Sequence, residues 1–165
     1  MPVRRILALS ASLVAIDGKD LRAEPRLSTL VRHGRATTSS GDTEILTNPL
    51  GSMSRLAATA DELERRTPRR FPIDARKVFG TSSGVVEARF TLPAGWRARL
   101  PKSVTATSAF GSYSSEYAQE GRELRITRRI TGARGVLPPE RVGELVSFLR
   151  TVAADDARFI VIEKK

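Results

Sequence analysis

Five short strand-like segments follow one another between residues 85 and 131, and they constrain the fold more than any other part of the sequence. They are rich in β-branched and aromatic residues, and turn-forming residues such as Gly95, Gly111 and Gly121 lie between them. The segments are 85–91, 97–100, 103–110, 113–119 and 124–131. Regular short strands joined by tight turns predict an antiparallel β-sandwich or barrel.

Two helices and a closing strand complete the expected fold. Apolar residues recur at helical spacing over 53–66, and Pro68 ends this helix. A longer helix is expected over 138–154, because two prolines suit its first turn and apolar residues recur along it. The stretch 158–163 is apolar on both faces, which is typical of a central strand. We therefore expect a mainly β (α+β), antiparallel β-sandwich-like domain with one long helix near the C-terminus and a shorter mid-chain helix.

The N-terminal residues permit two interpretations. Two arginines precede an apolar run over 6–16 as in a signal peptide, but a convincing small-residue cleavage site is missing. The residues favour the alternative, a half-buried strand that ends at a turn formed by 17–20. The run is too short to span a bilayer, and no later apolar stretch is longer. We expect 1–20 to form a strand or a weak signal-like segment, and 21–165 to form a single domain.

The basic character of the chain comes mainly from arginine. The formal net charge is +10, and only five of the 28 basic residues are lysines. The charges are spread along the chain, with one denser stretch between residues 65 and 77; the only aromatics in or next to it are Phe71 and Phe79. A nucleic-acid-binding surface would normally add regularly spaced aromatics or a basic recognition helix. We therefore expect this stretch to face an acidic protein partner or a neighbouring domain, and nucleic acid or another anionic surface is the alternative. The candidate partner-binding residues are Arg65, Arg66, Arg69, Arg70, Arg76 and Lys77.

The residue types leave little room for catalysis. Cysteine is absent, and His33 is the only histidine, so thiol nucleophiles, thiolate metal sites and most general bases are excluded. Residues 80–84 match the Gly-x-Ser-x-Gly pattern of a nucleophile elbow around Ser82. That motif needs a helix after the serine and a later histidine, but a strand-like segment follows and no histidine does. We expect no catalytic, cofactor-binding or metal-binding residues, and we expect that the chain is not an enzyme.

Most aromatic residues fall in expected strands, in turns beside strands, or on the face of the long helix. Core packing is therefore their expected role. A ligand platform is the less favoured alternative for Trp96, which follows a tight turn. The aromatic residues assigned to the core are Phe90, Trp96, Phe110, Tyr113, Tyr117, Phe148 and Phe159.

A series of short motifs, in this order and at this spacing, resembles the C-terminal region of bacterial transglutaminase-like proteins. The motifs are FTLPAGW at 90–96, LP at 100–101, FGSY at 110–113, LRITRR at 124–129, LPP at 137–139, LVSF at 145–148 and FIVIEK at 159–164. In that family a β-rich domain of unknown function follows the catalytic core. The resemblance implies an accessory β-sandwich module, usually in exported or envelope-associated proteins. It does not imply activity, because the family's Cys-His-Asp constellation lies in a core that this chain lacks.

Overall fold

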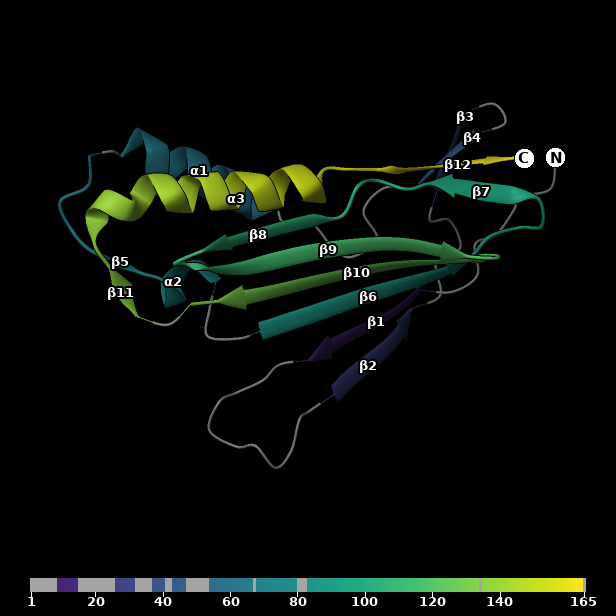
Figure 1. Cartoon of the computed structure of the whole chain (residues 1–165), viewed down its shortest axis with the longest axis horizontal. Coiled ribbons are helices and arrows are strands. Elements are labelled where there is room, and N and C mark those ends of the chain that lie inside the picture. The colour runs from purple at the N-terminus through teal and green to yellow at the C-terminus, as the bar shows by residue number, and fades with distance from the viewer. Residues whose placement is uncertain are drawn as a thin grey trace.

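The computed structural model describes residues 9–14, 26–31, 37–40, 43–46, 54–66, 68–79, 83–133 and 135–164. These residues form a mainly β fold with antiparallel sheets, a long helix near the C-terminus and a shorter helix in the middle of the chain (Figure 1). The expected fold class is therefore confirmed. The turn expected at 17–20, His33, and residues 80–82 of the serine motif lie outside the described residues.

The main sheet contains the long strands of the central segment. Its four antiparallel strands lie in the order β6 (Ser83–Thr91), β10 (Glu123–Gly132), β9 (Gly111–Glu120) and β8 (Val104–Ser108). β9 and β10 form a hairpin whose turn includes Gly121, with a positive φ of 56°. Because the two long strands lie at the centre, the residues that alternate inward on them form the floor of the core.

A smaller antiparallel sheet lies at one end of the molecule. Its strands follow the order β3 (Thr37–Ser40), β4 (Thr43–Leu46), β12 (Ile160–Lys164) and β7 (Trp96–Arg99). The closing strand β12 is central, as its sequence predicts. At the edge strand β7, the N–H of Ala98 donates to Oε1 of Gln119 from the main sheet at 2.8 Å, so a side chain satisfies this backbone group.

A separate two-stranded sheet lies near the N-terminus. β1 (Leu9–Val14) and β2 (Arg26–Val31) pair antiparallel, with Leu9 opposite Val31. β1 contacts β6, so this pair continues beyond the β6 side of the main sheet (Figure 1). Within the apolar run at 6–16, residues 9–14 are thus extended.

The helices cover the opposite end of the molecule from the small sheet. α1 (Ser54–Arg65) packs on α3 (Val142–Asp156), which a short 3-10 turn, η1 (Pro139–Arg141), precedes. A two-stranded ribbon of β5 (Ile73–Asp74) and β11 (Val136–Leu137) and the single turn α2 (Arg76–Phe79) lie beyond them (Figure 1). Among the described residues, no helix is both long and apolar enough to cross a membrane.

Three apolar clusters fill the interior. The first joins the two four-stranded sheets through residues such as Phe90, Leu124 and Ile162, and Trp96 and Tyr117 pack against it. The second lies under α1, α3 and the β5–β11 ribbon, and the third places Phe148 and Val152 of α3 on Tyr113 of the main sheet. Six of the seven aromatics assigned to the core pack in these clusters, Trp96 and Tyr117 at their margins.

Phe159 is the exception among these aromatics. Its side chain is 56% exposed. It directly precedes β12, whose residues Ile160 and Ile162 face the core. Side chains alternate between the two faces of a strand, so Phe159 points away from the core with Val161. The assignment of Phe159 to the core was therefore wrong, because the described residues cover only one face of the chain at this position.

Candidate functional site

The basic stretch is not a free linker, because it contains folded elements. It begins in the last turn of α1 and continues through β5 and α2. Ile73 and Ala75 are buried within it and belong to the second apolar cluster. The cations of this stretch therefore lie on a structured surface.

Two of the six candidate cations are bound to neighbouring carboxylates. Arg66 forms an ion pair with Glu62 one helical turn earlier, at 2.7 Å. Arg76 donates from Nε and Nη2 to the two carboxylate oxygens of Asp74, both at 3.0 Å. This hydrogen bonding by Arg76 is the main cause that lowers the pKa of the Asp74 carboxyl. Arg66 and Arg76 are thus already paired with carboxylates of the same chain.

The other four cations have no carboxylate partner among the described residues. Arg65 donates from Nε to the backbone oxygen of Asp61, and Arg70 and Lys77 are exposed. Arg69 is half-buried, and its Nε has no hydrogen-bond partner in the part of the chain that the structure describes. These four residues carry the unmatched positive charge of the stretch.

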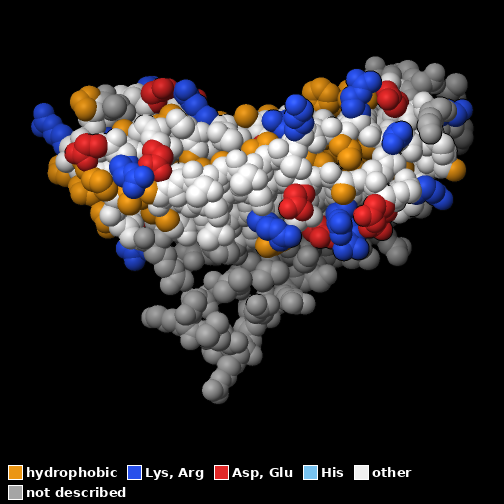
Figure 2. Space-filling model, in the orientation of Figure 1, with side chains coloured by type: hydrophobic (Ala, Val, Ile, Leu, Met, Phe, Trp, Pro, Cys, Tyr) orange, Lys and Arg blue, Asp and Glu red, His pale blue; other side chains and the backbone are white. Residues whose placement is uncertain are grey.

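Exposed apolar side chains lie beside these cations. Phe71 is 75% exposed and directly follows Arg70, and Val136 is 62% exposed. The β5–β11 ribbon brings their segments together, since Val136 pairs with Asp74 and the N–H of Ala75 donates to the backbone oxygen of Gly135 at 3.0 Å. Figure 2 shows hydrophobic side chains gathered with charged ones at this end of the molecule. We call Arg69, Arg70, Phe71, Lys77 and Val136 the basic-aromatic end.

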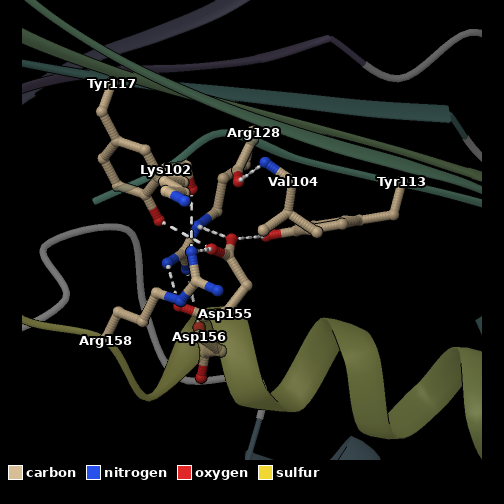
Figure 3. Close-up of polar contacts among 9 residues, drawn as sticks. Lys102, Val104, Tyr113, Tyr117, Arg128, Asp155, Asp156 and Arg158 are labelled. Carbon is tan, nitrogen blue, oxygen red and sulfur yellow. Dashed lines mark hydrogen bonds and ion pairs between the residues drawn. The ribbon is translucent and has the colours of Figure 1, made fainter. Parts of the chain in front are cut away.

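A buried polar network lies between the sheet and the end of α3 (Figure 3). Asp155, in the last turn of α3, is fully buried, and Tyr113 of β9 donates from its hydroxyl to Oδ2 of Asp155 at 2.5 Å. The hydroxyl of Tyr117, four residues further along β9, donates to Oδ1 of the same carboxylate at 3.1 Å. Both oxygens of Asp155 therefore accept hydrogen bonds from one strand of the main sheet.

Arg128 of β10 supplies the buried positive charge of this network. Its Nη1 donates to Oδ1 of Asp156 at 2.7 Å, and its Nη2 donates to the backbone oxygen of Asp155 at 3.3 Å. Arg158 lies 3.4 Å from Asp155 and donates from Nη1 to the backbone oxygen of Lys102 at 2.8 Å. Two arginines thus face two aspartates, and the network ties α3, the main sheet and the segment after β7 together.

Burial and neighbouring groups shift the pKa values of Tyr113, Tyr117 and Arg128. Burial raises the pKa of the Tyr113 hydroxyl, and its hydrogen bond to Asp155 raises it further. Burial also raises the pKa of Tyr117. For Arg128, burial opposes the charge, but Tyr117, Tyr113 and Asp156 favour it and the pKa is raised. The charged state of Arg128 offsets two aspartates at a helix C-terminus, where the helix dipole disfavours negative charge.

This network holds the end of α3 on the main sheet. Asp155, which accepts hydrogen bonds from both tyrosines, is inaccessible to solvent. Among the described residues, no group of three or more histidine, cysteine, aspartate or glutamate side chains could hold a metal ion. At the serine motif, the described part begins with β6 at Ser83, so a strand follows the motif rather than a helix.

Sequence reasoning missed this network, although one signal was present. The inward residues of β10 alternate as Leu124, Ile126, Arg128 and Ile130, so arginine interrupts an apolar row. A charge at an inward position requires a buried partner. The structure places Asp155 and Asp156 in the last turn of α3, where both are buried.

Comparison with known proteins gives one family match. The family model of a domain of unknown function, DUF3858, matches residues 44–162. These residues run from β4 to β12 and include both four-stranded sheets apart from β3, all the helices, and the buried network. No curated protein and no solved structure matches the chain.

Proposed function

The chain belongs to the DUF3858 family of domains of unknown function, and from this premise we propose that it is a non-catalytic interaction module that binds an acidic protein surface. The observation that carries this proposal is the basic-aromatic end. There, Arg69, Arg70 and Lys77 lie without carboxylate partners among the described residues beside the exposed side chains of Phe71 and Val136.

The composition of this end is that of an energetically important interface. Arginine and aromatic residues dominate the small sets of residues that provide most of the binding energy in protein complexes. The neighbouring cations Arg66 and Arg76 are already paired, so the unmatched charge is concentrated on few side chains. A partner with carboxylates around an apolar side chain would match both features.

We propose further that the partner is a transglutaminase-like catalytic domain encoded in the same reading frame or in an adjoining one. The order of motifs from 90 to 164 supports this context, because it resembles the accessory region of bacterial transglutaminase-like proteins. In that arrangement the chain contributes binding and positioning, and the chemistry belongs to the partner.

The test is a binding measurement with the purified chain. The adjoining coding sequence is read for a transglutaminase-like core, that core is expressed, and its affinity for the chain is measured by calorimetry. The variant R69S/R70S should bind more weakly, and F71S should weaken binding independently. R125S/R129S is the matched control, because it removes the same charge from two exposed positions of β10 on the main sheet.

Three outcomes would count against the proposal. Absence of a transglutaminase-like core from the neighbouring sequence would remove that context. Equal weakening by the control variant would show that only net charge matters. Binding to DNA or RNA that falls steeply with salt would instead favour the nucleic-acid alternative; the paired state of Arg66 and Arg76 argues against it.

A further inference from the structure

The outer face of the small sheet carries apolar side chains that no described part of the chain covers. Phe159 is 56% exposed, and Val161 and its cross-strand partner Ile45 are half-buried on the same face. An apolar residue on each face is the pattern of a strand buried on both sides. In β12, Ile160 and Ile162 satisfy this pattern on the inner face alone.

Cations border this apolar row. Arg99 lies opposite Val161, and Arg97 lies opposite Glu163, both on the edge strand β7. Arg99 is 3.6 Å from Glu163, whereas Arg97 has no carboxylate partner among the described residues. We call Ile45, Arg97, Arg99, Phe159 and Val161 the Phe159 face.

Phe159 continues this row toward the helices. It lies in the connection from α3 to β12, which runs from the helices to the small sheet in Figure 1, and Val161 and Ile45 follow on the sheet itself.

The connection itself is held rigidly. Arg158, the residue before Phe159, binds Asp155 of the buried network and the backbone oxygen of Lys102. The chain directly before the exposed Phe159 is therefore anchored to α3 and to Lys102. Fixing an exposed aromatic before binding reduces the entropy lost on association.

We propose that the Phe159 face binds an acidic, amphipathic segment of a protein partner, separately from the basic-aromatic end. Apolar side chains of that segment would cover Phe159 and Val161, and its carboxylates would approach Arg97 and Arg99. Charge complementarity selects this partner, because the border of the face carries two arginines and one glutamate. The chain would then join two partners from opposite ends of its long axis.

The probe is a short synthetic peptide of leucine and glutamate, with the leucines at helical spacing, labelled with a fluorophore. Its affinity for the whole chain is measured by polarisation, and its position is mapped by NMR on the ¹⁵N-labelled chain. We expect shifts confined to 43–46, 97–102 and 158–163. F159S should raise the dissociation constant about tenfold, a loss of roughly 1.4 kcal/mol. R97S/R99S should weaken binding as well, and so should replacing the glutamates of the peptide by glutamine.

F71S is the matched control, since it removes an exposed phenylalanine at the other end. It should leave peptide binding unchanged, so failure here is distinguishable from failure of the function proposed above. Unchanged affinity in F159S, absence of peptide binding, or shifts at 69–77 alone would overturn the proposal. So would Phe159-dependent binding to vesicles of phosphatidylcholine and phosphatidylglycerol without peptide binding. Urea unfolding of each variant confirms that the chain is folded.

Discussion

Arg128 and Asp156 form a buried ion pair, with 2.7 Å between Nη1 of the arginine and Oδ1 of the aspartate. The two side chains come from the middle of the main sheet and from the last residue of α3. Removing one partner of such a pair leaves an uncompensated buried charge, which costs more than the pair itself contributes. The fold is therefore sensitive to the loss of either partner of this pair.

Replacing Arg128 by methionine should strongly destabilise the chain. Asp155 and Asp156 would remain buried without their main cation, so we expect the free energy of unfolding to fall by about 3–5 kcal/mol. Urea denaturation followed by circular dichroism measures this change. The control is R129M on the adjacent, exposed residue, which should change stability by no more than about 0.5 kcal/mol. Similar losses in both variants would show that Arg128 has no special role.

Removing one hydroxyl group at a time should show that the two tyrosines contribute differently to stability. Y113F keeps the buried ring but takes away the hydrogen bond to Asp155, so it should destabilise by about 1–3 kcal/mol. Y117F should cost less, because the hydroxyl of Tyr117 is less buried and its bond is longer, at 3.1 Å against 2.5 Å. The comparison of the two unfolding midpoints is the measurement, and a larger loss in Y117F would contradict this order.

The same tyrosines predict a loss of stability at alkaline pH. Their pKa values are raised in the folded chain, while those of the unfolded chain lie at about 10. Above that pH the unfolded chain releases protons that the folded chain retains, so stability is full below about pH 10 and falls as pH rises further.

Absorbance of tyrosinate tests this directly, because the chain contains only two tyrosines and both lie in the network. The folded chain should ionise at higher pH than the chain in guanidinium chloride. Coincident titration curves would rule out the burial that raises these pKa values.

Glu144 should stabilise the chain at neutral pH and not in acid. Its carboxylate accepts a hydrogen bond from the N–H of Ala109 at 2.6 Å and pairs with Arg141, and the bond to Ala109 is the main cause that lowers its pKa. A lowered pKa stabilises the fold above the ordinary value of about 4.3, and this contribution disappears as pH falls through the folded value. E144Q should therefore lower Tm at pH 7, and the difference should shrink in acid. E140Q, at an exposed position one helical turn earlier, is the control.

Two glycines with positive φ should respond differently to alanine. At Gly111, φ is 152° and a Cβ would lie 2.2 Å from the backbone oxygen of Thr131, so the paired strand would have to move. At Gly121, φ is 56° and a Cβ would meet nothing within 4 Å. G121A should cost about 1–2 kcal/mol for the left-handed backbone, and G111A should cost more. Equal losses in urea denaturation would argue against the close approach at Gly111.

The sequence predicted the bounds of several helices and strands to within a few residues. The helix expected over 53–66 is α1 at Ser54–Arg65, and the segment expected as a strand over 124–131 is β10 at Glu123–Gly132. Periodicity and turn residues decide such elements, because they depend on neighbours close in the chain. The central position of β12 was also predicted, from its apolar residues, and β4 and β7 pair with its two edges.

The candidate sites could not be predicted in the same way, because they depend on contacts between residues far apart in the chain. The sequence showed a cluster of cations from 65 to 77, but not that Glu62 and Asp74 pair with two of them or that β11 brings Val136 beside the others. The arginine at an inward position of β10 indicated a buried partner without indicating which carboxylate.

The sequence by itself therefore determined the fold class, the order of the two main helices and of the strands from β6 to β12 apart from β11, and the absence of cysteine. Only the tertiary structure decided which strands share a sheet, that Arg128 meets Asp155 and Asp156, and that Phe159 lies outside the core. The physical reason is that periodicity shows which side of an element is apolar. Which element packs on that side depends on how all the elements pack together in the folded chain. That packing minimises exposed apolar surface and unpaired buried charge over all elements together.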